Sequence, residues 1–441
     1  MKTSIAVLAA VAALPALAAE QAKAPEPFAF ADFRWMNGNS RQSEFPLDGP
    51  VFSGQFTIET AYAYEFTNPK DHTVVGSTPI GRSNELQIVH LGVGGDFHWK
   101  GVRGRIMTQL GTYSTMTPRS DASTSRGQWS LDNAYRYISE GYGGYHFDVD
   151  SGLNIDAGIF PSYVGLFSYY NYENWNDQAS YSSSTPWFFN GVRIQWFPSD
   201  KLKIEPWIVN GWQSYGMFNE MPGFGLQIAY RPTGWLAMVA SQYVGKDTLG
   251  NVGRTRLHTD DSILVKYYQN GSSFLNQGAL SLTVDLGCET GGGTVCFGGD
   301  KNTPAQSFAG LMLYNRWWFA DQKVGFTFGG GAMVNPGRYL VPTPPINGAT
   351  AATGSAYFSQ AKGDDYKAWD MTLTLDYMPS QFVTFRSEYT HRWANVPYFA
   401  GAGGVTPPGG NTGAPGSAVP GWAPDLVQAE NRLMFAILLR I

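Results

Sequence analysis

Apolar side chains occupy every second position over the last eleven residues of the chain, Asn431–Ile441. Successive side chains of a β-strand point to opposite faces, so the pattern predicts a strand with one wholly apolar face. Its other face carries Arg432 and Arg440. Such a strand suits the wall of a membrane barrel, which faces lipid on the outside and water on the inside. A half-buried edge strand of a soluble protein would show the same alternation.

The two-residue period recurs along the chain and predicts sixteen strands. Short polar turns and long connections alternate between them, as in single-chain bacterial barrels, where the two kinds of connection lie on opposite rims. We therefore predict an all-β fold, a transmembrane antiparallel β-barrel with short periplasmic turns and long external loops. The predicted strands are 56–66, 89–99, 102–110, 135–148, 153–161, 187–197, 202–210, 223–231, 234–244, 261–269, 278–287, 308–319, 322–334, 367–378, 382–392 and 430–441.

The N-terminus has the pattern of a secretory signal. Lys2 gives a cationic start, an apolar stretch follows, and Ala16-Leu17-Ala18 is typical of a cleavage site. No later apolar run reaches the ~18 residues that a membrane helix needs, so a chain that spans a membrane must do so as a closed barrel. The expected segments are a signal peptide over 1–19, an N-terminal segment that caps or enters the barrel over 20–53, and the barrel over 54–441.

Composition favours the barrel. Charged residues make up only 15% of the chain, against roughly a quarter in ordinary soluble domains, and aromatic residues also reach 15%. A formal net charge of −5 excludes a strongly basic nucleic-acid binder. Aromatic rings near strand ends predict two girdles at the membrane surfaces. They are Trp99, Trp196, Trp207, Trp235, Trp317, Trp318, Tyr267 and Tyr377.

Two cysteines, Cys288 and Cys296, flank a glycine-rich stretch, and in an oxidising compartment this spacing predicts a disulfide. A metal site would need more ligands, so we expect no metal and no cofactor. The six histidines form no His-Glu-x-x-His pattern, and we predict no catalytic residues. If the barrel were instead a hydrolase of the lipid face, His391 would be its base.

The inward faces of the predicted strands carry most of the chemistry, because the charges that line a pore set its selectivity. Cations slightly outnumber anions there, which indicates a mild anion preference; the alternative is that these charges only solvate the wall. Arg440, Asp96 and Glu140 share this inward face. The predicted pore-lining residues are Arg103, Arg105, Arg136, Arg193, Lys266, Arg316, Arg386, Glu388 and Arg392.

The third long connection, 162–186, is rich in aromatic residues with hydrogen-bonding residues between them. It would narrow the channel if it folded inward, and its rings would guide a sugar-like solute by stacking. An external loop that packs its rings on the rim fits the sequence equally well. The residues proposed for a constriction are Tyr170, Tyr172, Glu173, Trp175 and Asp177.

Several short motifs resemble those of the OmpL-like β-barrel porin family. Phe33-Arg-Trp-Met-Asn-Gly-Asn-Ser-Arg-Gln42 is similar to its N-terminal signature, and Pro186-Trp-Phe-Phe-Asn-Gly-Val-Arg193 followed by Val209-Asn-Gly-Trp212 to its central one. Asn335-Pro-Gly-Arg-Tyr-Leu340 and Arg386-Ser-Glu-Tyr-Thr-His-Arg392 resemble its late strands. The family often has an acidic residue after a glycine such as Gly165, where this chain has Leu166. The resemblance implies an outer-membrane porin and brings no catalytic residues and no substrate.

These patterns together predict a protein of the outer membrane of a Gram-negative bacterium that lets small polar solutes or ions diffuse through its lumen. The expected partners are outer-membrane lipid and lipopolysaccharide, the barrel assembly machinery and, in a homotrimer, further copies of the chain. Two alternatives remain open from sequence. One is a non-conducting structural or adhesive barrel, blocked by residues 20–53, and the other is a soluble secreted β-rich glycan-binding protein.

Overall fold

The computed structural model describes residues 25–76, 78–177, 185–300, 305–336, 339, 366–408, 410 and 421–441. The predicted signal peptide, residues 1–19, lies outside the described residues. In the described part of the chain, no helix is long and apolar enough to cross a membrane.

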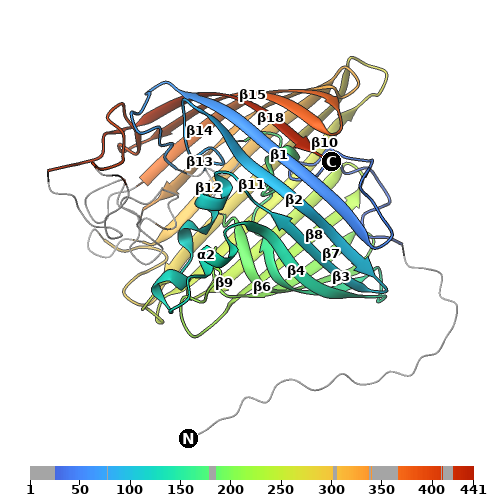
Figure 1. The fold of residues 1–441 in the computed structure, drawn as a ribbon, viewed down its shortest axis with the longest axis horizontal. Helices are drawn as coiled ribbons and strands as arrows, with labels where there is room; N and C mark the ends of the chain where they lie inside the picture. Colours follow the sequence, from blue (N-terminus) through green and yellow to red (C-terminus); the bar gives the residue numbers. More distant parts are fainter. Residues whose placement is uncertain are drawn as a thin grey trace, which may run out of the picture.

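Sixteen strands of the described chain form one closed antiparallel barrel, which confirms the predicted fold (Figure 1). The first strand, β1 (Phe52–Glu65), closes the cylinder by pairing with the last, β18 (Ala429–Arg440). The others are β2 (Leu86–Trp99), β3 (Val102–Thr108), β4 (Ile138–Phe147), β5 (Leu153–Pro161), β6 (Phe188–Ser199), β7 (Leu202–Val209), β8 (Gly223–Thr233), β9 (Leu236–Gly245), β10 (Thr255–Gln269), β11 (Leu275–Thr290), β12 (Ser307–Phe319), β13 (Val324–Asn335), β14 (Tyr366–Ser380) and β15 (Val383–Ala394).

The alternation of apolar and polar residues along the strands corresponds to the outer and inner faces of the barrel wall. In β18, Phe435 and Ile437 are 51% and 45% exposed on the outer face, whereas Met434 before them and Leu438 after them are 2% and 1% exposed. The inward face of this strand is therefore not bathed in water, although it points into the barrel. Protein must cover it from within.

The connections divide between two rims. Short turns gather at one end of the barrel, on the right in Figure 1, and long connections at the other. The long connection before β4 contains the short helices α1 (Tyr113–Met116) and α2 (Leu131–Tyr135), so β4 begins three residues later than predicted, at Ile138. Strands β10 and β11 extend beyond their predicted limits, and the last long connection holds a small hairpin of β16 (Phe399–Ala400) and β17 (Leu426–Val427).

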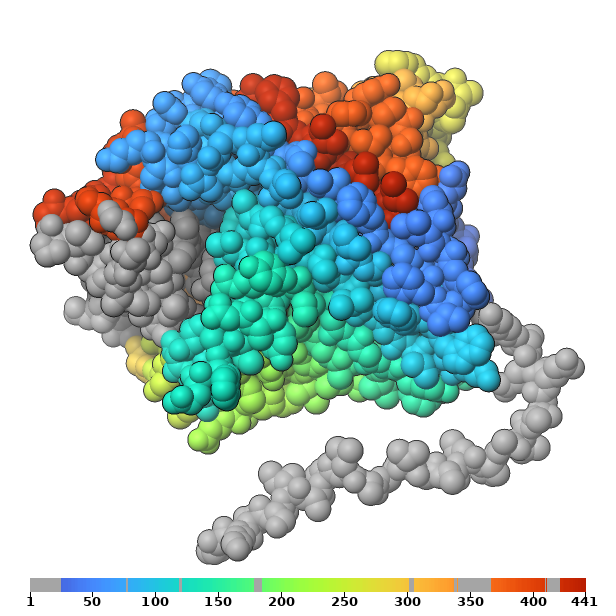
Figure 2. All heavy atoms as spheres, in the orientation of Figure 1, coloured from blue at the N-terminus to red at the C-terminus, as the bar shows by residue number. Residues whose placement is uncertain are grey.

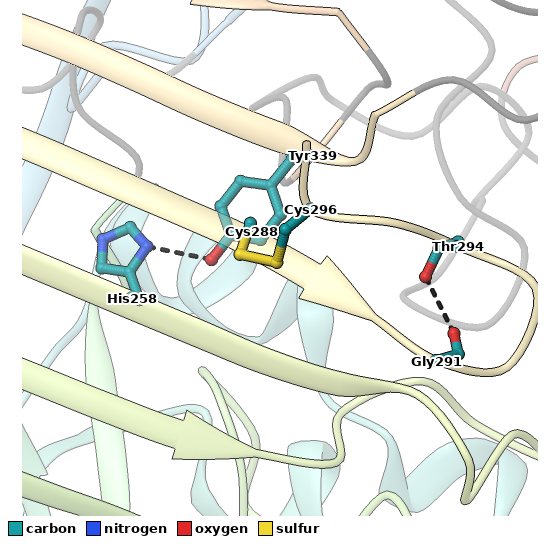
Figure 3. Close-up of a disulfide and its surroundings, with 6 residues drawn as sticks. All are labelled: His258, Cys288, Gly291, Thr294, Cys296 and Tyr339. Carbon is teal, nitrogen blue, oxygen red and sulfur yellow. Dashed lines mark hydrogen bonds between the residues drawn. A yellow bond between two sulfur atoms is a disulfide. The ribbon is translucent and has the colours of Figure 1, made fainter. Parts of the chain in front are cut away.

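A disulfide joins Cys288, near the end of β11, to Cys296, with an S–S distance of 2.10 Å (Figure 3). It closes the loop that carries the glycine-rich stretch on the rim of long connections. Beside it, the His258 Nδ1 atom lies 2.9 Å from the Tyr339 hydroxyl, which links β10 to the connection after β13.

The girdle prediction is wrong for two of its eight residues. Trp207 and Trp318 are only 3% and 7% exposed, because they fall on the inward side of β7 and β12. Trp99, Trp235 and Tyr267 are more than half exposed, as a ring at the membrane surface should be.

A cation on the outer face should weaken the barrel. Leu313 of β12 is 48% exposed among apolar neighbours, so Leu313→Arg should lower the free energy of unfolding in lipid vesicles by about 2 kcal/mol or more. Urea titration followed by tryptophan fluorescence measures it. His98→Arg is the control, since His98 of β2 lies on the face opposite to Phe97 and Trp99 and is already exposed to water. Equal stability of the Leu313 variant and the unmodified protein would contradict the assignment of the outer face.

Candidate functional site: an occupied lumen with a polar cavity

The connection between β5 and β6 folds into the barrel. Trp175 and Asp177 are 3% and 1% exposed. The Asn171 amide donates to the Glu59 carboxylate of β1 at 2.9 Å, and the Arg386 guanidinium of β15 donates to the Asn174 carbonyl at 2.8 Å. The segment therefore crosses the lumen from its own strands to the opposite wall. We call residues 162–177 the inner loop.

Aromatic rings of the inner loop pack against other protein groups. The Tyr170 and Tyr172 rings stack at 5.4 Å with an interplanar angle of 12°, and the Arg440 guanidinium lies 5.1 Å from the Tyr172 ring centroid. Trp175 meets Trp318 of β12 edge to face at 5.7 Å. The rings thus anchor the loop to the wall, and the faces of Tyr172 are already covered, which argues against a sugar platform on this ring.

Buried ion pairs hold the same loop. Arg386 and Arg316 both contact the Asp376 carboxylate at 2.8 Å, and Arg386 also pairs with Asp177 of the inner loop. The Asp177 amide donates to Glu388 at 2.9 Å. Burial raises the pKa of Asp177, and the Arg386 charge opposes that rise. Arg316, Arg386 and Glu388 point into the barrel as predicted, but the loop covers them.

Two further predicted pore-lining cations are engaged elsewhere. Arg392 is fully buried, pairs with Glu430 and donates to the Val75 carbonyl at 2.7 Å, so it ties an external connection to the wall. Lys266 lies 5.6 Å from the ring of Trp35 in the N-terminal segment. The prediction that Arg136 lines the pore is wrong. Arg136 caps the C-terminus of α2 and pairs with Asp132 at 3.1 Å, outside the barrel strands. The chain is helical at this point, where a strand was expected.

The N-terminal segment, described from residue 25, crosses the rim of short turns. The Phe28 amide donates to the Asp200 carbonyl at 2.7 Å, and the Trp35 indole donates to the Gly234 carbonyl at 3.2 Å. Arg41 donates to the Ser380 carbonyl at 2.7 Å. These acceptors lie in two turns, at Asp200 and Gly234, and at the end of β14, at Ser380. Figure 2 shows the N-terminal segment in dark blue, against the ends of the C-terminal strands at this rim.

The N-terminal segment and the inner loop meet inside the barrel. The Trp175 amide donates to the Asn37 side chain at 2.9 Å, and the Gly38 amide donates to the Glu173 carbonyl at 3.2 Å. Gly38 has φ +80°, and a Cβ placed on it would lie 2.3 Å from the Leu166 carbonyl oxygen. Only glycine fits this approach without strain. The two segments reach the lumen from opposite rims and form one contact.

Space remains on the side of β2, β3 and β4. A cavity of about 490 Å³ opens at the rim of short turns, and a second of about 340 Å³ lies next to it; the two share Asp96 and Tyr142 in their linings. The second is bounded by the inner loop and is strongly polar. Its charged lining residues are Asp96, Arg105, Glu140, Glu173 and Arg440.

A tyrosine closes this space toward the other rim. The Tyr170 hydroxyl donates to Glu140 of β4 at 2.6 Å and lies 3.0 Å from the Ser139 hydroxyl. A third, smaller cavity of about 60 Å³ lies beyond the loop and is lined by Tyr169 instead of Tyr170. Ser168 lines both this cavity and the 340 Å³ cavity, so the inner loop lies between the two, and Tyr170 holds the loop against β4 there.

The sequence singled out Arg103, Arg105 and Glu173 of this space, but it gave Asp96, Glu140 and Arg440 only an inward face. Arg103 and Arg105 line the two larger cavities, whereas Arg193 pairs with Asp156 at 3.0 Å and lies against the rings of Tyr142 and Phe160. Gln55 of β1 was missed altogether. Its neutral side chain carries no signal in a search for charge, although it donates to the Tyr172 hydroxyl at 3.0 Å.

Residues 52–414 match a family model described as "Putative beta-barrel porin-2, OmpL-like". The match covers most of the chain, including fifteen of the sixteen barrel strands. The chain belongs to this family. Membership in the OmpL-like porins, together with the closed barrel, places the protein in the outer membrane of a Gram-negative bacterium and contradicts the soluble glycan-binding alternative.

The chain is similar to several solved structures at low sequence identity. The anion-selective porin of Comamonas acidovorans is 11% identical, with a TM-score of 0.50 over 88% of this chain and 99% of that one. The loop-deletion variant of OmpT from Vibrio cholerae is 8% identical, with a TM-score of 0.49 over 89% and 99%. The DcaP channel of Acinetobacter baumannii is 12% identical, with 0.47 over 89% and 96%. No curated protein sequence matches the chain.

Replacing Gly38 should loosen the contact between the two inner segments. Gly38→Ala forces a side chain against the Leu166 carbonyl and leaves a positive φ, at a cost of about 1–2 kcal/mol. A 1 kcal/mol penalty raises the population of the released segment about fivefold, so trypsin should cleave after Arg34 and Arg41 correspondingly faster. Gly271→Ala, at an open turn position on the same rim, is the control. Unchanged cleavage would contradict a stabilising contact between the N-terminal segment and the inner loop.

Proposed function

We propose that this protein is a passive diffusion channel for small polar solutes, which pass between the inner loop and the wall formed by β2, β3 and β4. The observation that carries the proposal is the pair of adjoining cavities, about 490 and 340 Å³, beside this wall, of which the second is strongly polar. A barrel of this strand number is wide enough to keep space for water beside an inserted loop. Transport needs no cofactor, because solutes move down their gradient.

The charges along this route support weak ion selectivity. Its two cavities are lined by four cations, Lys100, Arg103, Arg105 and Arg440, and by three anions, Asp96, Glu140 and Glu173. Most of these groups already pair with each other, so little unbalanced charge faces a passing ion. We propose at most a mild anion preference.

A non-conducting structural or adhesive barrel is the second candidate. The contact of the N-terminal segment with the inner loop favours a non-conducting barrel, because these two segments fill the lumen beside β12, β14 and β15. We propose residues 20–53 as the segment that caps this side. The outer wall contacts lipid; lipopolysaccharide contact at the external rim, insertion by the barrel assembly machinery and a homotrimer are further proposals that follow from the porin family.

Single-channel conductance in planar bilayers separates the two functions and tests the position of the constriction. Tyr170→Ala removes the ring and hydroxyl that close the inner cavities at Glu140, so it should raise the conductance in KCl clearly. Tyr170→Phe keeps the ring and should change the conductance less. The control is Tyr137→Ala, at an exposed position away from the lumen. A barrel that conducts neither before nor after Tyr170→Ala would support the non-conducting alternative.

Reversal potentials in a KCl gradient test the selectivity. With seven charged groups that nearly cancel, we expect a small shift toward the chloride potential. Arg103→Gln, which removes one of the four cations, should shift the reversal potential toward potassium. A strongly cation-selective unmodified channel would contradict this description of the lining.

A further inference from the structure

Two guanidinium groups lie next to each other on the wall of the 340 Å³ cavity. Arg105 Nη2 and Arg440 Nη2 both donate to the Gln55 side-chain oxygen, at 2.8 and 3.4 Å. The Gln55 amide nitrogen donates to the Tyr172 hydroxyl at 3.0 Å, which fixes the direction of the shared oxygen. Strands β3 and β18 and the inner loop are thereby joined at one point, and two cations are held side by side.

Carboxylates flank this arginine pair. Arg105 contacts Asp96 at 2.6 Å and Glu140 at 2.9 Å, and Arg440 pairs with Glu173. The side chain of Asp96 is 50% exposed, whereas that of Glu140 is 10% exposed. A carboxylate has about four acceptor positions, so the Asp96 carboxylate can take a second donor from the cavity.

The arginines also keep hydrogen-bonding capacity. Each guanidinium has five N–H groups, and Arg105 donates three bonds, to Asp96, Gln55 and Glu140. Arg440 donates to Glu173 and Gln55. The planar fork of N–H groups on an arginine matches the two oxygens of a carboxylate, which an ammonium group such as lysine cannot do.

The charge balance indicates which solute fits. Three carboxylates surround two guanidinium groups, so a simple anion meets excess negative charge and a simple cation meets the arginine pair. We propose that this cavity binds zwitterionic solutes of amino-acid type, with the solute carboxylate on Arg105 and Arg440 and its ammonium on Asp96. The volume lies at the lower end of the range for small-molecule sites, about 300–1,000 Å³. A role of this site in transport rests on the proposed channel function. Binding of the solute does not, since it needs no conduction.

Binding of β-alanine to the detergent-purified full chain, measured by equilibrium dialysis, tests the proposal. Propionate and propylammonium, each with one of the two charges, are the matched probes and should bind more weakly. Arg105→Gln and Arg440→Gln each remove a charged donor and should weaken β-alanine binding about tenfold. Arg136→Gln, a cation outside the strands, is the control and should change nothing.

A second variant separates the two ends of the solute. Asp96→Asn should weaken β-alanine binding and leave propionate binding equal or stronger, because it removes the ammonium partner and one negative charge. Heat modifiability in detergent gels establishes which variants form barrels. If an arginine variant does not form a barrel, binding to the Asp96→Asn variant tests the proposal instead. Equal binding of β-alanine and propionate to the unmodified protein, or β-alanine binding that none of the folded variants weakens, would overturn the proposal.

Failure of the channel function would look different. Protein that binds β-alanine selectively but gives no KCl conductance would refute the channel and retain the zwitterion site. A conducting protein in which β-alanine neither binds nor lowers the current more than propionate does would retain the channel and refute the site.

Discussion

Backbone hydrogen bonding in lipid is the constraint on which this structure depends. A hydrocarbon layer offers no partner to an amide, so the sheet can have no free edge and must close on itself. Pairing of β1 with β18 provides that closure, from Thr57 opposite Arg440 to Glu65 opposite Arg432. Once the cylinder is closed, every second side chain meets lipid and the others meet whatever fills the interior. The outer and inner chemistry of the protein both follow from this one requirement.

The interior is partly a protein core. An inward charge in a barrel is often taken to line water, yet Arg316, Arg386 and Asp376 are buried beneath the inner loop and satisfy each other there. Breaking such a buried network is expensive, because the partner left behind is an unpaired charge out of water. The network therefore anchors the inner loop to the wall of β12, β14 and β15. The cavities beside β2 to β4, where we propose the solute route, lie away from this anchor.

Residues far apart in the chain create the polar cavity. Gln55, Arg105 and Arg440 come from the first, third and last barrel strands, and Tyr172 and Glu173 come from the loop that crosses the lumen. The N-terminal segment supports this loop through Asn37 and Gly38. The width of the cavity and the position of its charges thus depend on a contact between segments that enter from opposite rims.

The two-residue period alone determined the barrel, its strand number and the side of the wall on which each strand residue lies, because neighbouring side chains in a strand must point to opposite faces. The same period also places Trp207 and Trp318 inward, on the faces of Glu205 and Arg316, which the girdle prediction overlooked. It could not show that Arg136 follows a helical turn. Which inward residues are covered and which meet the cavity was decided by tertiary structure. Trp175 and Asn37 are 138 positions apart, and no local pattern encodes a contact that exists only after the cylinder has closed around both segments.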